Sequence, residues 1–171
     1  MDTAGEIHTK PIHRVLHMLL LLFAAGCLRT GGSTVMVEQG IAGTWQLNRE
    51  QSDIPPVTKS QVVVLETDGV SVKMREILVN DKGESLTISF NGKFDGRDYP
   101  VSGTPFADTV SYRLLAPNTI EGVAKKNGVV VVKEMAMLSD DGKTLRVTYV
   151  SVDGEGNSLT SHGVFERVEA R

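Results

Sequence analysis

The chain contains very few cysteine and histidine residues, and their scarcity excludes several kinds of site. Cys27 is the only cysteine in 171 residues, so no intramolecular disulfide, redox pair or thiolate zinc site can form. His8, His13 and His17 precede Cys27, which leaves His162 as the only histidine after it. A histidine metal cluster is therefore excluded from that part of the chain, and the sequence predicts no metal and no cofactor.

Charge of one sign and long apolar runs are also lacking. Lys and Arg total 18 against 21 Asp and Glu, a net charge of −3, so no basic field exists to attract nucleic acid. Apolar residues make up 40% of the chain, which fits a globular body better than a disordered or membrane-spanning one. We expect a single folded domain and a monomer that binds no nucleic acid.

The first 26 residues have the features of an export signal. Lys10 and Arg14 precede an apolar run from Val15 to Ala25, which is shorter than the roughly 18 apolar residues that a membrane span needs. The run ends in small residues, as a secretory signal does. We therefore expect an exported protein.

The segment from Ala24 to Cys27 resembles a bacterial lipobox, in which the cysteine is acylated and becomes the new N-terminus. Ala24 stands where Leu is preferred, and Ala24 with Gly26 also fits ordinary signal cleavage, which is the alternative. Acylation would anchor the protein to a membrane of the cell envelope through Cys27, in the periplasm or at the outer membrane if the cell is Gram-negative. The expected plan is a lipoprotein signal peptide at 1–26, a flexible tether at 27–40 and a folded domain at 41–171.

Turn dipeptides recur at short intervals after Gly43 and predict a series of β-hairpins. Asp-Gly and Asn-Gly tolerate the positive φ of tight turns, and their density leaves little room for helices. Residues 49–59 are interrupted by Pro55-Pro56 and predict a loop or one short turn at the mouth of a barrel. The dipeptides are Asp68-Gly69, Asn91-Gly92, Asp95-Gly96, Asn127-Gly128, Asp141-Gly142 and Asp153-Gly154, and Asp81-Lys82-Gly83 is a longer version.

The segments between these turns are rich in Val, Ile, Thr, Tyr and Phe and predict about ten strands. Leu86, Ile88 and Phe90 alternate with polar residues, whereas 62–65 and 129–132 are apolar on both faces. Because an open edge of such runs would promote aggregation, an antiparallel up-and-down β-barrel of about 8–10 strands is favoured over a two-sheet sandwich. The expected strands are 43–48, 60–67, 70–79, 84–91, 93–100, 109–115, 119–126, 129–138, 144–152 and 158–168.

The motif Gly43-Thr44-Trp45 at the start of the first strand resembles the G-x-W signature of lipocalins. In that family the Trp packs across the closed end of the barrel and a late Arg lies over its ring. Arg167 is the matching residue here. The resemblance implies a structural signature made of Gly43, Trp45 and Arg167.

Longer segments are similar to a group of bacterial lipocalin-like secreted proteins, of the calycin superfamily. This resemblance implies a fold and an export address, but no reaction. Gly163 and Phe165 stand where fatty-acid-binding proteins carry the Arg and Tyr that grip a carboxylate, so a bound fatty acid is not implied. The similar segments are 43–48, 94–103, 107–111 and 139–145.

The interior of the expected barrel is where a binding function would lie. A barrel of this size leaves a cavity for a small ligand unless side chains fill it. The candidate ligand-binding residues, predicted from strand parity, are Phe90, Tyr112, Met135, Met137 and Tyr149. The methionines would give an adaptable apolar lining and the phenols a polar handle; the alternative is that all five only pack the core.

Two functions follow from this reasoning. The favoured one is an envelope lipoprotein whose barrel binds a small apolar or amphipathic molecule. The alternative is a structural or interaction protein of the envelope, with a filled barrel and no ligand. We expect no catalytic residue, because His162 is better explained as a half-exposed strand residue than as a general base.

Overall fold

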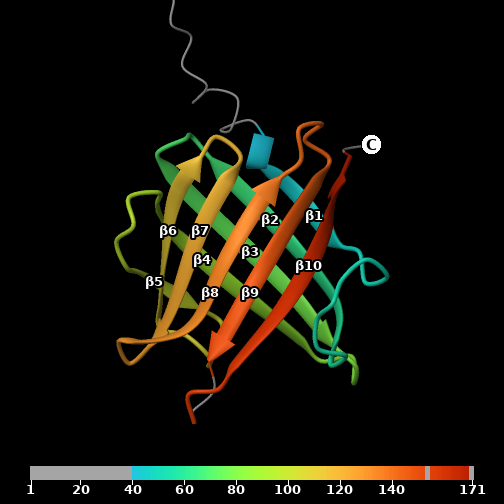
Figure 1. Ribbon diagram of the computed structural model, residues 1–171, viewed down its shortest axis with the longest axis vertical. Helices are drawn as coiled ribbons and strands as arrows, with labels where there is room; N and C mark the ends of the chain where they lie inside the picture. The colour runs from blue at the N-terminus through green and yellow to red at the C-terminus, as the bar shows by residue number, and fades with distance from the viewer. Residues whose placement is uncertain (1–39, 153–154, 170–171) are drawn as a thin grey trace, which may run out of the picture. The chain divides into compact units, whose positions relative to one another are not determined.

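The computed structural model describes residues 40–152 and 155–169, which form a closed antiparallel β-barrel (Figure 1). Each strand pairs with its neighbour in sequence, and β1 pairs with β10 to close the sheet. The predicted all-β, up-and-down, lipocalin-like barrel is confirmed, and the two-sheet sandwich is excluded. The strands are β1 (Gly43–Leu47), β2 (Thr58–Thr67), β3 (Ser71–Asn80), β4 (Ser85–Lys93), β5 (Tyr99–Ser102), β6 (Thr109–Ala116), β7 (Thr119–Lys126), β8 (Val129–Leu138), β9 (Thr144–Val152) and β10 (Ser158–Val168).

The expected signal peptide, Cys27 and the tether up to residue 39 lie outside the described residues. Within the described residues, no helix combines the length and the apolar character that a membrane crossing requires. The export and the lipid anchor therefore remain predictions from the sequence.

The hairpin turns have the backbone that their sequences predict. Asn127 (φ 50°) and Gly128 (φ 77°) are both left-handed, as a two-residue type I′ turn between β7 and β8 requires. Gly69, Gly83 and Gly142 also have positive φ. The predicted turn at 153–154 lies outside the described residues.

The predicted turn at Asn91-Gly92 is wrong, and so is the strand expected over 93–100. Both residues belong to β4, and the chain turns over 94–98 instead, where Gly96 has a φ of 74°. A Cβ on Gly92 would lie 2.6 Å from Phe90 Cζ and 2.9 Å from Tyr99 Cγ. Gly92 is therefore needed for the packing of two aromatic rings inside the barrel, not for a turn.

The segment between β1 and β2 contains no helix, as predicted. Asp53 exchanges two backbone hydrogen bonds of 2.7 Å with His162, and the Ser52 hydroxyl accepts a 2.9 Å bond from the Val164 amide. Because β1 ends at Leu47, this loop continues the pairing along the edge of β10. The loop thus satisfies backbone groups that the short β1 leaves open.

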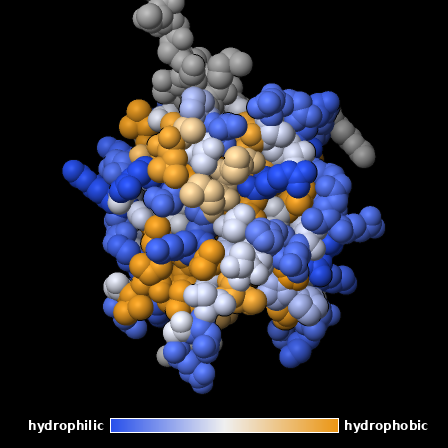
Figure 2. Space-filling model, viewed as in Figure 1, coloured by the Kyte–Doolittle hydropathy of each residue, from blue (hydrophilic) through white to orange (hydrophobic). Residues whose placement is uncertain are grey.

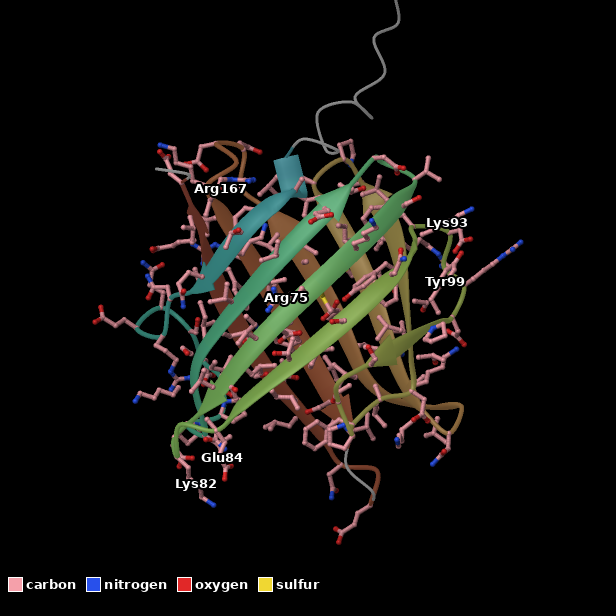
Figure 3. The ribbon with its side chains drawn as sticks, turned by 180° about the vertical axis from the view of Figure 1, so that it is seen from behind. Arg75, Lys82, Glu84, Lys93, Tyr99 and Arg167 are labelled. Carbon is pink, nitrogen blue, oxygen red and sulfur yellow. The ribbon has the colours of Figure 1, made fainter. Side chains whose placement is uncertain are left out.

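The outer face of the barrel shown in Figure 2 is largely hydrophilic, and apolar side chains gather there in a few patches. The interior holds two apolar clusters, one around Trp45 and Phe165 and one around Phe90 and Val110. Arg167 lies at one end of the barrel, whereas Lys82 and Glu84 lie at the other end (Figure 3). The polar outer face and the apolar interior follow from the alternation of strand residues, since successive side chains point to opposite faces of the sheet.

Candidate functional site

The end of the barrel where β1 begins is closed by a tryptophan and an arginine. Trp45 is 0% exposed, and its indole nitrogen donates a 2.9 Å hydrogen bond to the Ile41 carbonyl. The Arg167 guanidinium carbon lies 4.2 Å from the centre of the Trp45 ring, a cation–π contact on a buried indole. The expected pairing of Trp45 with Arg167 is confirmed.

Backbone carbonyls and a glycine hold Arg167 in this position. Its guanidinium donates hydrogen bonds to the carbonyls of Ala42 (2.6 Å), Gly142 (2.7 Å) and Gly40. A Cβ on Gly43, whose φ is 139°, would lie only 2.5 Å from Arg167 Nη1. The glycine of the signature is therefore required both by its backbone conformation and by the space that Arg167 occupies.

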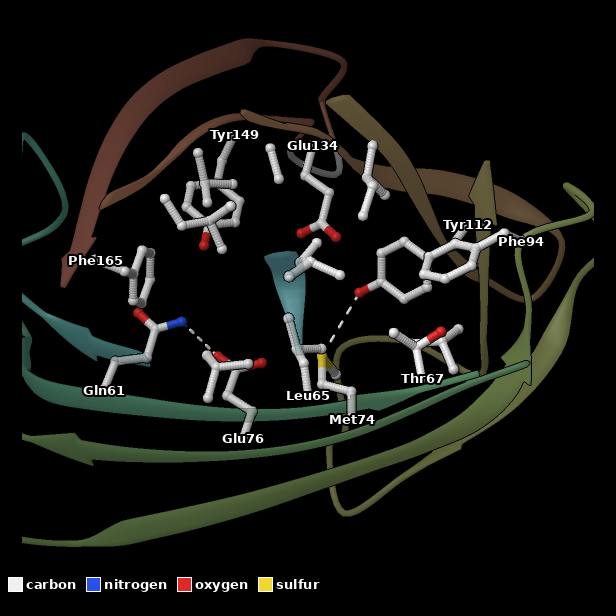
Figure 4. Close-up of a pocket in the computed structure, with 17 residues that line it drawn as sticks. Gln61, Leu65, Thr67, Met74, Glu76, Phe94, Tyr112, Glu134, Tyr149 and Phe165 are labelled. Carbon is white, nitrogen blue, oxygen red and sulfur yellow. Dashed lines mark hydrogen bonds between the residues drawn. The ribbon is translucent and has the colours of Figure 1, made fainter. Parts of the chain in front are cut away.

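Beside this closed end, the barrel encloses a cavity of about 100 Å³ (Figure 4). Strands β2, β3, β6, β7, β8, β9 and β10 contribute to its wall. Most of the lining is aliphatic or aromatic, and six side chains carry a polar group. The lining residues are Ile41, Gln61, Val63, Leu65, Thr67, Val72, Met74, Glu76, Phe94, Tyr112, Ile120, Glu134, Ala136, Leu145, Val147, Tyr149 and Phe165.

Three of the five candidate residues predicted from parity do face inward. Tyr112 and Tyr149 line the cavity. Phe90 is buried in the neighbouring cluster, where its ring meets Tyr112 edge-on at 5.1 Å and Tyr99 at 6.3 Å between centroids. Phe90 therefore supports the wall of the cavity without lining it.

The placement of Met135 and Met137 inside the barrel is wrong. Glu134 and Ala136 are the β8 residues that line the cavity, and Met137 is 52% exposed on the outer side. The error arose because β8 begins with a run that is apolar on both faces and so gives no parity. Lys133 has the same parity as the two methionines, and this was the available signal that they point outward.

Glu76 and Gln61 form a polar pair on one wall of the cavity. They come from the paired strands β3 and β2, and Gln61 Nε2 donates a 2.5 Å hydrogen bond to Glu76 Oε1. Burial raises the pKa of Glu76 to about 7, with a smaller contribution from the charge of Glu134. Glu76 therefore titrates near neutral pH inside the barrel.

Glu134 projects into the cavity from β8, next to Tyr112. Burial raises its pKa, and a hydrogen bond with Tyr112 opposes part of this rise. A Cβ on Gly122 would lie 2.4 Å from Glu134 Oε1 and 2.7 Å from Tyr112 Cε1. The missing side chain at Gly122 thus makes room for both of these groups, while the Tyr112 hydroxyl also donates a 3.6 Å bond to the sulfur of Met74.

The sequence reasoning missed both glutamates, although their strand positions carried a signal. Glu76 has the parity of Val72 and Met74, which face inward. Glu134 likewise has the parity of Ala136 and Leu138. A charged residue on the apolar side of a strand was the indication of an interior polar group.

No cation faces the two glutamates in the part of the chain that the structure describes. The ion pairs found there lie at the surface, such as Lys125 with Asp98 and Arg113 with Glu121, and none includes Glu76 or Glu134. The same residues contain no group of three His, Cys, Asp or Glu side chains that could hold a metal ion. The cavity is therefore an apolar space that contains acceptor oxygens and no positive charge.

Comparison with known proteins places the chain beside several solved structures at low identity. No family model and no curated protein matches it. Lobster apocrustacyanin A1 matches with 14% identity over 77% of this chain and 63% of that chain, at a TM-score of 0.41. The chain thus spans less than two thirds of the length of that protein.

Two further structures match over most of their length. An S-type phycobiliprotein lyase from Guillardia theta is 10% identical over 82% of this chain and 95% of that chain, with a TM-score of 0.47. A protein solved in complex with DFHBI is 12% identical over 78% of this chain and 99% of that chain, with a TM-score of 0.40.

Proposed function

We propose that the barrel binds a small, mostly apolar molecule that carries at least one polar group. The observation that carries this proposal is the cavity, in which aliphatic and aromatic walls surround a few inward polar side chains. Such a combination is typical of small-molecule sites, where apolar contacts give affinity and a few polar groups fix orientation. The interior of the barrel is not filled by its own side chains.

The size of the cavity limits the ligand. An apolar cavity of roughly 150 Å³ in another protein binds benzene, so the volume of about 100 Å³ found here limits the ligand to about one small ring or a short branched chain. A long acyl chain would require the lining to move. This agrees with the absence of the residues that grip a fatty-acid carboxylate at positions 163 and 165.

A cavity-filling substitution tests the binding site against a matched control on the same strand. Ala136→Phe places a ring inside the cavity, whereas Met137→Phe places it on the exposed side of β8. We expect wild type and Met137→Phe to take up toluene or displace a fluorescent apolar dye, and Ala136→Phe to lose at least about tenfold in affinity. Equal binding by all three proteins, or no binding by any, contradicts the proposal.

We further propose that this binding takes place at the cell envelope, with the barrel anchored through acylated Cys27. The support is the basic and apolar segment before Cys27 and the position of the only cysteine at its end. Labelling of cells with a palmitate analogue should mark the wild type and not Cys27→Ala. Label that persists in Cys27→Ala, or none on the wild type, contradicts the anchor.

We propose binding as the function of this cavity, whose lining includes no Ser, Cys, His or Lys side chain. His162 is exposed on the outer side of β10, where its Nδ1 lies 3.2 Å from the Thr148 hydroxyl. It therefore does not face the cavity.

The alternative function, a structural or interaction protein, has its own support on the outer face. Leu115, Val129 and Met137 are 49%, 66% and 52% exposed. Figure 2 also shows apolar side chains that gather in patches on one face of the barrel. Substitution of Val129 by Lys should release an envelope partner held through this face. A partner that is retained by this variant would count against the alternative.

A further inference from the structure

Glu76 and Glu134 reach the same cavity from strands that are far apart in the barrel. Glu76 stands on β3 and Glu134 on β8, and Figure 4 shows their carboxyl groups directed into the space between these walls. The two carboxyl groups interact electrostatically, since the charge of Glu134 raises the pKa of Glu76. The cavity therefore combines two acidic groups within one enclosed space.

The oxygens of these carboxyl groups face the cavity and receive few hydrogen bonds. The Gln61 amide donates to one oxygen of Glu76, and the Tyr112 hydroxyl donates to the sulfur of Met74. Burial raises the pKa of Glu134, and Tyr112 lowers that pKa by a smaller amount. The titratable groups that face the cavity are the two glutamates, Tyr112 and Tyr149, none of which is a cation. Carboxylates that face an apolar space are unfavourable unless a proton or a cation compensates their charge.

We propose that the molecule bound in the barrel is a small apolar amine, whose protonated nitrogen binds the carboxylates of Glu76 and Glu134. This inference rests on the proposed binding function and names the chemical class of the ligand. An ammonium group supplies three N–H donors and one positive charge, which are the elements missing from the cavity.

The remaining lining suits the rest of such a molecule. Phe94, Phe165 and the aliphatic side chains offer apolar contact, and the phenol rings of Tyr112 and Tyr149 can face a cation. Gly122 keeps the approach to Glu134 free of a side chain. A molecule with one small ring and one amino group matches the chemistry of the cavity, and small movements of the lining would be needed to admit it.

Calorimetry with three probes of similar shape tests the inference. Benzylamine, benzyl alcohol and toluene differ in charge and hydrogen bonding while sharing one ring. With the full-length protein near neutral pH, we expect benzylamine to bind at least about tenfold more tightly than benzyl alcohol. Titrations in two buffers of different ionisation enthalpy should show protons released on binding of the amine, because binding favours the ionised carboxylates.

Three variants assign this preference to the cavity. Glu134→Gln and Glu76→Gln should each reduce the preference for benzylamine by about tenfold or more, while toluene binding changes little. Glu121→Gln, which removes a carboxylate at the surface of β7, is the matched control and should behave as wild type. For wild type alone, amine affinity should rise between about pH 5 and pH 8 as Glu76, whose pKa is raised to about 7, loses its proton.

The outcomes separate the two proposals. Equal affinity for the amine and the alcohol, or an amine affinity that does not rise with pH in wild type, overturns the amine inference while toluene binding keeps the proposed function. Failure of all three probes to bind contradicts both. The pH series needs no substitution, so it decides the question even if one variant does not fold.

Discussion

The closed end of the barrel and its cavity both hold charged side chains, and the two regions differ in how those charges are compensated. At the closed end, the Arg167 guanidinium stacks on Trp45 and donates to three carbonyls, so its charge and its donors are compensated within the chain. In the cavity, Glu76 and Glu134 face an apolar space with few donors and without a cation among the described residues. The charge at the closed end is compensated within the chain, whereas the described residues do not compensate the charges in the cavity.

The difference in compensation indicates different roles for the two regions, one in stability and one in binding. Buried polar groups with full partners stabilise a unique structure, and those without them reduce stability unless something else binds. The Trp45 region therefore has the character of a structural element. The carboxylates of the cavity have the character of a site that a ligand completes.

The largest expected effect on stability comes from removing the tryptophan that closes one end of the barrel. Trp45→Ala removes a fully buried indole and leaves a void, which should lower the free energy of unfolding by about 3–5 kcal/mol. Urea denaturation followed by far-UV circular dichroism measures this, because the variant has no tryptophan to report fluorescence. Val129→Ala, at a residue 66% exposed, is the control and should change stability by less than about 0.5 kcal/mol. Similar losses in the two variants would contradict the structural role of Trp45.

A smaller effect is expected from the cavity, where the protonation of Glu76 should make the stability of the protein depend on pH. The pKa of Glu76 is about 7 in the folded chain against 4.5 as its ordinary value, so the folded state holds this proton more tightly than the unfolded state does. The stability that comes from this protonation is therefore fully present below about pH 4.5 and is lost as the pH rises through about 7, a total of roughly 3 kcal/mol.

Urea denaturation at a series of pH values checks this prediction. Glu76→Gln should flatten the decline between about pH 5 and pH 8, because the amide does not titrate. Glu121→Gln, at the surface, should leave the decline as in wild type. A wild-type profile that does not fall over this range would show that Glu76 is not compensated by a proton.

The smallest expected effect tests how completely Arg167 is satisfied. Arg167→Lys keeps a positive charge but loses the planar fork that reaches the carbonyls of Gly40, Ala42 and Gly142 at once. We expect a loss of about 1–2 kcal/mol in unfolding free energy. The emission of Trp45, the only tryptophan, should also change because the cation over its ring moves. Unchanged stability and emission would contradict the role of the guanidinium fork.

Much of the fold could be predicted from the sequence because its signals are local. The positive φ of Gly69, Gly128 and Gly142 follows from their turn dipeptides, and the pairing of Trp45 with Arg167 follows from a resemblance that extends across the barrel. Gly92 misled the prediction, since a glycine required by two aromatic rings looks the same in sequence as a glycine required by a turn.

The site was less predictable than the fold. Tyr112 and Tyr149 were placed in the interior correctly by alternation, whereas Met135 was not, because β8 has apolar residues on both sides. Glu76 and Glu134 have inward parity, but only aromatic residues and methionines were selected as candidates for the interior. Hydrophobicity is a guide to packing, and it fails where a buried polar group is retained.

The sequence by itself determined the hairpin order and the alternation of most strands, because turn chemistry and side-chain parity act over a few residues. The closed end of the barrel was predicted through the resemblance to lipocalins. Only the tertiary structure decided that strands β3 and β8 bring Glu76 and Glu134 to one cavity, and that Gly122 leaves room for the second of them. The physical reason is that barrel closure fixes which inward side chains meet across the interior. That meeting depends on the register of all ten strands together.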